Sequence, residues 1–355
     1  MGANIDVFDT YYMAGMVKEI TPTPSFFKDR YFGEEDPFST DKVLIEFMDG
    51  DQTMVPFIAP RVGDIPVDRE GYQIFEFEPS LIAPSRILSL DDLKKRGFGE
   101  ALFAGSTPAE RAKKIQLRDL TDLDRRIARR EEWMAAQTII NNGVDMVEFI
   151  DADTQGQTVP IRFYDTSGSN PGVYTVSPVW TTWALMCADV VAMCDALSKR
   201  GLPVSDLVLG STTWATVKGF TGLLDELDNR SIDVGQIRAS IAGTGVTYLG
   251  KLNFEGYMLD VFVARETYVD ASGVTQLYFP AKSAMVSAPA CGKTYYGAVT
   301  QIDYGAEEFE TYTGRRIPKL CINQEKDIRK LRLAARPITA PKNKAPWIYA
   351  ANVVS

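Results

Sequence analysis

The sequence predicts an α+β protein arranged around one very long helix. Residues 107–142 have the pattern of a single helical segment, and residues 42–78 carry strand patterns with no helix among them. Residues 167–265 mix helical and strand patterns, and strand patterns return after them. A chain of 355 residues can bury a substantial core, so we expect two or three subdomains.

The long helix has clear start and stop signals. Thr107 can cap the first turn, Pro108 needs no hydrogen-bond donor at the first helical position, and Glu110 can reach back to the cap. After Pro108, neither Gly nor Pro occurs until the stop signal Asn141-Asn142-Gly143. At about 1.5 Å per residue, such a helix is roughly 50 Å long.

The apolar stripe of this helix is narrow. Its members are Leu117, Leu120, Leu123, Ile127 and Met134, whereas positions 130 and 131 are charged. Two interpretations stay open. The helix is either an amphipathic helix lying on one domain, or a strut that spans a flat molecule and offers its charges to neighbouring copies.

The segment before the helix has a different character. Residues 42–47 and 72–78 predict two strands, with Phe75 and Phe77 on one face, and residues 54–58 also read as extended. A two-stranded ribbon is marginal in isolation, so these aromatic side chains need another surface, in the same chain or in the next.

Residues 1–40 show no regular period. We expect an arm ordered by whatever it lies against, or else a partly disordered terminus. Within it, Glu34-Glu35-Asp36-Pro37 is predicted to be an acidic turn.

After the long helix, strands and helices are predicted in alternation up to a proline-rich end. We expect Pro337, Pro341 and Pro346 to break up that end. The predicted strands are residues 144–150, 158–164, 207–209, 246–249, 257–264, 276–279, 284–287, 295–302 and 328–334, and the predicted helices are residues 180–199 and 212–217.

Composition excludes several classes of function. The net charge of −9 argues against an overall affinity for nucleic acid, and the absence of histidine removes His-based catalysis and His-ligated zinc. The cysteines Cys187, Cys194, Cys291 and Cys321 are predicted to be free thiols in a reducing cytoplasm. Neither a signal peptide nor a membrane-spanning run of about 18 apolar residues is evident, so no membrane association is expected.

One motif points weakly to nucleotide binding. Gly292, Lys293 and Thr294 resemble the end of a phosphate-binding loop, but position 287 is Ser where the motif needs Gly. The residues that follow are strand-like, whereas phosphate binding needs a helix N-terminus there. The acidic residues at 34–36 and 307–308 are expected to be solvated, so we predict no catalytic, cofactor or metal site.

Several segments resemble, in order along most of the chain, the phage lambda-type major capsid proteins (the major capsid protein E family), which have the tailed-phage major capsid fold. The most specific is Arg130-Glu131-Glu132-Trp133-Met134-Ala135-Ala136, near the end of the long helix. The others are Thr23-Pro24-Ser25-Phe26-Phe27-Lys28-Asp29-Arg30-Tyr31-Phe32, Phe38-Ser39-Thr40-Asp41-Lys42-Val43, Phe77-Glu78-Pro79-Ser80-Leu81-Ile82-Ala83-Pro84, Tyr248-Leu249-Gly250, Tyr278-Phe279-Pro280 and Tyr296-Gly297-Ala298.

The resemblance implies a division of the chain. It comprises an N-terminal arm (1–40), an E-loop (41–88), a peripheral domain (89–166) with its spine helix (107–142), an axial domain (167–265) and a C-terminal part of the peripheral domain (266–355). Contacts between copies are then expected at Pro37, Phe38, Tyr72, Phe75, Phe77, Arg125 and Arg129.

The implied function is that of a non-enzymatic shell protein. Hexamers and pentamers would form an icosahedral phage capsid in the host cytoplasm, with a scaffold protein, a portal and in some cases a decoration protein. The capsid would enclose DNA without sequence-specific binding. Two alternatives are a bacterial nanocompartment shell and a nucleotide-dependent enzyme using Lys293 and Thr294.

Overall fold

The computed structural model confirms a mixed α+β chain with one dominant helix. It describes residues 13, 15, 25–40, 42–48, 72–89, 108–149, 155–164, 166, 170–223, 240–241, 245–303, 307–323 and 328–355. The helices among these residues are α2 (Phe27–Tyr31), α4 (Pro108–Asn141), α5 (Trp183–Ser198) and α6 (Ser211–Val217).

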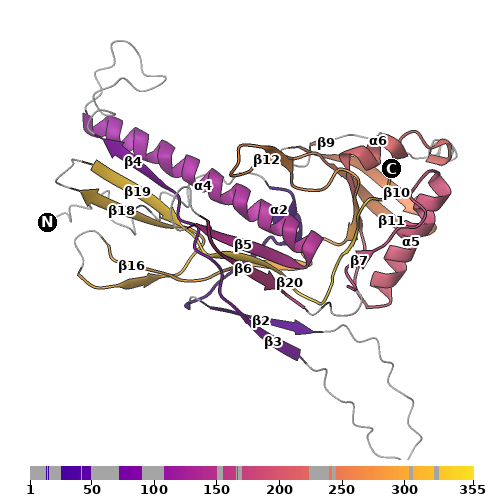
Figure 1. Cartoon of the computed structure of the whole chain (residues 1–355), viewed down its shortest axis with the longest axis horizontal. Helices are drawn as coiled ribbons and strands as arrows, with labels where there is room; N and C mark the ends of the chain where they lie inside the picture. The colour runs from indigo at the N-terminus through magenta and orange to yellow at the C-terminus, as the bar shows by residue number, and fades with distance from the viewer. Residues whose placement is uncertain are drawn as a thin grey trace, which may run out of the picture.

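Helix α4 crosses much of the molecule. It runs from the strands β4, β19 and β18 near its start to the seven-stranded sheet near its far end (Figure 1). Its predicted end is confirmed, because Asn142 has a φ of 54° and Gly143 a φ of 152°. A Cβ atom on Gly143 would lie 1.9 Å from the carbonyl oxygen of Ile161, so only glycine fits there. The helix starts at Pro108; the predicted cap residue Thr107 lies outside the described residues.

A seven-stranded mixed sheet lies at the far end of α4, with α5 and α6 beside it (Figure 1). The strands predicted over 207–209, 257–264 and 284–287 and both predicted helices are confirmed with small shifts in their bounds, whereas the strand predicted from 246 extends to Phe254 and three further strands of this sheet were not predicted. In spatial order the strands are β7 (Val173–Tyr174), β21 (Ile348–Ala350), β14 (Ala284–Ser287), β8 (Asp206–Gly210), β11 (Tyr257–Ala264), β10 (Val246–Phe254) and β9 (Ser240–Ile241).

The first half of α4 covers a three-stranded antiparallel sheet. Its spatial order is β18 (Ile317–Asn323), β19 (Ile328–Ala334) and β4 (Ser85–Ser89). Leu320, Leu331 and Leu333 pack on Leu120 and Leu123 of the helix, which makes one apolar layer between helix and sheet. Only β19 was predicted here.

A second three-stranded sheet corrects two predictions. It contains β1 (Glu34–Pro37), β15 (Gly292–Tyr296) and β20 (Pro337–Pro341), so the expected acidic turn is a strand parallel to β15. The carboxylate of Glu34 pairs with Lys293 and Lys342, which offsets the repulsion between adjacent acidic residues.

The prolines at the ends of β20 do not break up the C-terminal segment. Pro337 and Pro341 are opposite Tyr296 and Gly292 in an edge strand. The neighbouring Lys342 donates its backbone N–H to Cys291, so the proline positions are those whose nitrogens point away from β15.

Four two-stranded ribbons complete the described chain. The single strand predicted over residues 295–302 is wrong, because β15 ends at Tyr296 and a separate strand begins at Val299 to pair with β17. The domain boundaries given above stay a prediction. The ribbons are β2 (Val43–Met48) with β3 (Tyr72–Phe77), β5 (Gly143–Phe149) with β6 (Gln155–Arg162), β12 (Thr267–Val269) with β13 (Thr275–Leu277), and β16 (Val299–Gln301) with β17 (Glu310–Tyr312).

Candidate functional site

The segment from Ser25 to Thr40 is tied to α4 through one buried carboxylate. Glu132 accepts hydrogen bonds from the backbone N–H groups of Phe26, Phe27 and Lys28 at 3.0, 2.7 and 2.8 Å. These N–H groups lie at the N-terminus of α2 and have no partner inside the helix. The Glu132 side chain therefore caps α2, although it is 104 to 106 residues away in the sequence. Residues 25–40 are therefore ordered by what they lie against, whereas residues 1–24 of the predicted arm lie, apart from 13 and 15, outside the described residues.

Glu132 stands close to a second, half-buried carboxyl group, that of Glu266. Burial raises the pKa of Glu132 to about 7, despite the three hydrogen bonds it accepts. Burial, together with the charge of Glu132, raises the pKa of Glu266 to about 8. The Oε2 atom of Glu266 is buried and has no hydrogen-bond partner within the described parts of the chain. The junction therefore favours a bound proton at neutral pH.

A second buried network links α4 to the turn before β18. Arg316 donates to Glu131 at 2.6 and 3.0 Å and to Asp124 at 2.7 Å. Although burial opposes ionisation, the Arg316 guanidinium holds the pKa of Glu131 below its ordinary value. Tyr296 of β15 adds a hydrogen bond of 3.1 Å to Glu131. Removing one member would leave a buried charge without its partner.

A third contact connects the same segment to the seven-stranded sheet. Arg30 makes a two-pronged ion pair with Asp206 at the start of β8, at 2.5 and 2.9 Å. The Tyr31 hydroxyl donates to the same carboxylate at 3.1 Å. Residues 25–40 thus join α4, the β1–β15–β20 sheet and the seven-stranded sheet into one body.

Sequence reasoning missed these anchoring residues. Glu131 pairs with Arg316 and Glu132 binds backbone amides, and neither partner was predicted. A signal was present, because two charged positions stand where the apolar stripe should continue. Nothing in the sequence identified their partners.

The structure brings three of the predicted contact residues together at the base of the β2–β3 ribbon. Phe75 stacks on Phe77 with ring centroids 6.2 Å apart, and Phe77 meets the edge of Phe163 at 5.4 Å. Phe38 packs against Tyr295 at 5.7 Å in the same hydrophobic cluster. These aromatic residues therefore anchor the ribbon on their own chain.

The other predicted contact residues lie apart from that cluster. Pro37 is exposed at the end of β1, and Arg125 and Arg129 are exposed on α4. Tyr72 begins β3, and its side chain lies outside the described residues. Their role as contacts stays a prediction.

Lys293 and Thr294, the residues of the nucleotide-binding alternative, already have interaction partners within the fold. Lys293 and Thr294 belong to β15, which is paired on both sides by β1 and β20. The Lys293 amine lies 3.3 Å from Glu34, and the Thr294 hydroxyl donates to the Phe32 carbonyl at 2.8 Å. A central strand presents no helix N-terminus to a phosphate group.

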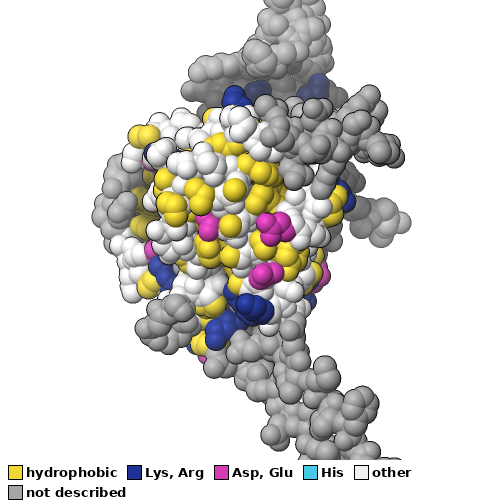
Figure 2. Space-filling view, turned by 90° about the vertical axis from the view of Figure 1, so that its right-hand side faces the viewer, with side chains coloured by type: hydrophobic (Ala, Val, Ile, Leu, Met, Phe, Trp, Pro, Cys, Tyr) yellow, Lys and Arg dark blue, Asp and Glu magenta, His cyan; other side chains and the backbone are white. Residues whose placement is uncertain are grey.

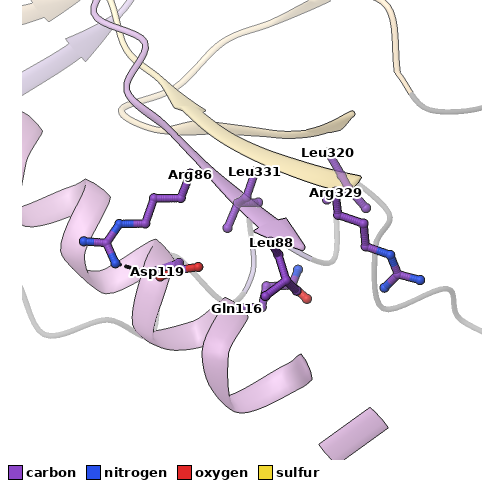
Figure 3. Close-up of a pocket in the computed structure, with 7 residues that line it drawn as sticks. All are labelled: Arg86, Leu88, Gln116, Asp119, Leu320, Arg329 and Leu331. Atoms are coloured by element: carbon purple, nitrogen blue, oxygen red, sulfur yellow. Dashed lines mark hydrogen bonds and ion pairs between the residues drawn. The ribbon is translucent and has the colours of Figure 1, made fainter. Parts of the chain in front are cut away.

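One small pocket opens between α4 and the β18–β19–β4 sheet (Figure 3). Its lining combines leucine side chains of the sheet with the ion pair between Arg86 and Asp119, whose atoms are 2.9 Å apart. It holds no nucleophile next to a base, so it offers no catalytic constellation. Across the described residues, no cluster of acidic or cysteine side chains is suited to a metal ion.

The face formed by the α5 side of the molecule is largely apolar. Figure 2 shows hydrophobic side chains gathered over the middle of this face, with a few acidic groups among them. Both acidic residues of α5 are engaged: Asp189 accepts from Tyr174 and Trp180 at 2.8 and 2.7 Å, and Asp195 accepts from Tyr257 at 2.7 Å. Apolar faces of this kind are common at protein contacts. Among the described helices, none is long and apolar enough to cross a membrane.

Comparison with known proteins gives a consistent result along the whole chain. The model of a family described as phage major capsid protein E matches residues 9–352. The P21 prophage-derived major head protein of Escherichia coli O6:H1 (strain CFT073) is 22% identical over 303 residues, which cover 82% of this chain and 84% of that protein. The major capsid protein of Escherichia phage lambda is 23% identical over 282 residues, 77% of this chain and 78% of that protein.

Solved structures agree at the level of the fold. A protein described as the capsid protein of an E. coli CFT073 prophage aligns over 97% of this chain and 98% of its own, with a TM-score of 0.63 and 16% identity. A phage-related protein from Bordetella bronchiseptica RB50 aligns over 96% of each chain, with a TM-score of 0.53 and 10% identity. The predicted capsid fold and the predicted family resemblance are both confirmed.

Proposed function

This chain belongs to the phage major capsid protein E family and is a major capsid protein of a phage or prophage, and from that premise we propose that its copies assemble as hexamers and pentamers into an icosahedral shell. The shell encloses DNA without sequence-specific binding, which suits a chain with a net charge of −9. Assembly takes place in the host cytoplasm, with a scaffold protein, a portal and a decoration protein as candidate partners. No enzymatic activity is involved.

The observation that carries this proposal is the β2–β3 ribbon, which stands away from the main body (Figure 1). Its base is anchored by Val43 and Ile45, which are fully buried, and by Phe75 and Phe77. Leu44, on the opposite face of the strand, is 54% exposed. An anchored ribbon with an apolar outer side chain is suited to lie on a neighbouring copy, with Pro37, Phe38 and, at the far end of the strand pair, Tyr72 as further contacts.

The exposed arginines of α4 extend the same proposal. Arg125 and Arg129 are one helical turn apart, so both point to the same side of the helix. That side offers two positive charges to an acidic neighbour. The aromatic residues would set the position of the ribbon, and the arginines would set the register between copies.

The test is the assembly state of the purified full-length chain. We expect sedimentation velocity and negative-stain microscopy to show ring-shaped capsomers or closed shells. A chain that stays monomeric, even when co-expressed with the other head proteins of its phage, would contradict the proposal. If shells form with protein cargo in place of DNA, the nanocompartment alternative would replace the phage capsid.

The enzyme alternative has its own test. Titration calorimetry with ATP is expected to show no binding, because Lys293 and Thr294 already have partners in β15. Binding that disappears in Lys293→Ala would overturn the proposal of a purely structural role.

A further inference from the structure

The β18–β19–β4 sheet has one face that α4 does not cover. Side chains alternate along each strand, and Leu320 and Leu331 face the helix. Their neighbours Lys319, Lys330 and Arg332 therefore lie on the opposite face. The register places Lys330 directly beside Ile87 of the edge strand β4, on that same side. We call these four residues the basic face.

The described residues cover this face only at one end. There Val299 of β16 packs on Ile317 and Ala334, and Arg332 donates to Gln301 at 3.0 Å. At the other end Ile87 is 62% exposed. No ion pair between described residues uses Lys319 or Lys330. Among the described residues, this face thus combines an exposed apolar side chain with two lysines that have no ion-pair partner there.

A second surface has the opposite charge. Glu307, Glu308, Phe309 and Glu310 lead into β17, and Phe309 is 74% exposed. We call these residues the acidic edge. No ion pair between described residues uses Glu307 or Glu308. The acidic edge is an exposed phenylalanine between carboxylates, and the basic face is an exposed isoleucine beside a lysine, so the two are both apolar at one residue and opposite in charge.

We propose that the acidic edge of one copy docks on the basic face of a neighbouring copy, with Phe309 against Ile87. Both side chains are more than half exposed, so most of their apolar surface is left for another molecule to cover. A second copy of the chain is therefore the occupant. The inference rests on the proposed shell, because it needs copies arranged side by side.

The apolar and the charged side chains of the proposed contact have different physical roles. Burial of the two apolar side chains supplies affinity, and the three acidic and three basic side chains select the register and make the contact sensitive to salt. The two patches are different surfaces, so each copy can use both at once. Such a contact can link copies into an extended or closed lattice, as a shell requires.

The favoured occupant is protein and not the phosphates of DNA. A phosphate backbone offers no apolar group to cover Ile87, the exposed apolar residue on the edge strand of this face. If Lys330→Glu left assembly unchanged and lowered only the amount of packaged DNA, the basic face would be a DNA contact and the proposal would be overturned.

Disulfide trapping tests the contact directly. The variant carries Ile87→Cys and Phe309→Cys in a Cys321→Ser background, because Cys321 lies beside Lys330 on the same face. We expect assembled particles to give covalent dimers and higher oligomers on oxidation, seen on a non-reducing denaturing gel. Each single-cysteine variant and the pair Met258→Cys with Phe309→Cys are matched controls, and they are expected to stay monomeric.

Two results of that experiment would overturn the proposal. Particles whose chains remain monomeric after oxidation would show that the patches do not meet. A disulfide within one chain would show that the hairpin closes on its own sheet. Wild-type protein assembled in parallel serves as a control. If it forms particles and the variant gives no disulfide between chains, the docking contact is wrong and the proposed shell is not.

Charge reversal gives an independent measurement. Lys330→Glu is expected to lower the assembly rate at least tenfold at low salt, and Glu308→Lys in the same chain is expected to restore most of it. Lys282→Glu, an exposed lysine elsewhere, is the control with the same change in net charge. Equal effects of Lys330→Glu and Lys282→Glu, or no rescue, would contradict the contact.

Discussion

The two halves of helix α4 have the same backbone geometry but differ in how their charged side chains are buried and paired. In the first half, one side packs on the β18–β19–β4 sheet while Leu117 is 46% exposed, and just past the midpoint Arg125 and Arg129 face solvent. In the second half, Glu131 and Glu132 are buried along with Ala135, Ala136 and Ile139. The second half is the junction of α2, β15, β20 and the seven-stranded sheet. The buried Glu131 and Glu132 hold the fold together, whereas the exposed Arg125 and Arg129 are available to other molecules.

The largest expected effect comes from the buried network of the second half. Arg316→Ala leaves the Glu131 carboxylate buried and unpaired, so we expect the free energy of unfolding to fall by about 3–5 kcal/mol. The first-half counterpart is Arg86→Ala, which breaks more exposed pairs with Asp119 and Asp122 and should cost less than about 1 kcal/mol. Urea unfolding of the dissociated chain measures both, and similar losses would contradict the distinction between the halves.

Loss of the long-range cap should have the next largest effect. Glu132→Ala removes the acceptor for three backbone N–H groups at the start of α2, and we expect a loss of about 2–3 kcal/mol in the free energy of unfolding. Glu132→Gln keeps one acceptor oxygen and should lose less. Hydrogen exchange of the Phe27 and Lys28 amides is the local readout, and protection equal to wild type in Glu132→Ala would refute the role of the cap.

Protonation of the same junction should make stability depend on pH. The pKa of Glu266 is raised to about 8 and that of Glu132 to about 7, so the folded state holds protons that the unfolded state releases above about pH 4.5. Their contribution is fully present below that pH and is lost as the pH rises through 7 and 8. We expect the free energy of unfolding to fall by on the order of 1–2 kcal/mol between about pH 5 and pH 9.

Glu266→Gln is the matched variant for this pH dependence, because it removes the titrating group and keeps the shape. It should flatten the upper part of the profile. The neighbouring charges are Arg129 and Asp29, with Tyr268 and Tyr278 facing the pair. Glu131 does not contribute in this range, since its pKa is lowered. A profile that rises with pH over the same range would contradict this assignment.

The smallest effect on stability, and a large one on assembly, is expected at the exposed arginines just past the midpoint of α4. Arg125→Glu with Arg129→Glu should change the free energy of unfolding by less than about 0.5 kcal/mol, because both side chains are exposed. If they contact neighbouring copies, the yield of particles should drop severely. Lys218→Glu with Lys282→Glu is the control of equal charge change. Normal particle yield in the arginine variant would remove these residues from the proposed contacts.

Much of the secondary structure could be predicted because its causes are local. The start and end of α4, the β2–β3 pair and the α5–β8–α6 order follow from caps, breakers and periodicity. Strands β1 and β20 were not predicted, because acidic residues and prolines usually disfavour strands. Here, contacts with distant residues and an edge position in the sheet remove that disadvantage. Glu34 is neutralised by Lys293 and Lys342, and Pro341 sits at an edge where no N–H is needed.

The amino-acid sequence by itself determined the fold class, the long helix, the family resemblance and the absence of histidine chemistry, since these depend on residue type and spacing alone. Only the tertiary structure showed that Glu132 caps a helix more than 100 residues away, that Arg316 neutralises Glu131, and that Ile87 and Phe309 stand exposed beside opposite charges. The physical reason is that the energy of a charge or an apolar group depends on its burial and its neighbours, which come together only when distant segments fold.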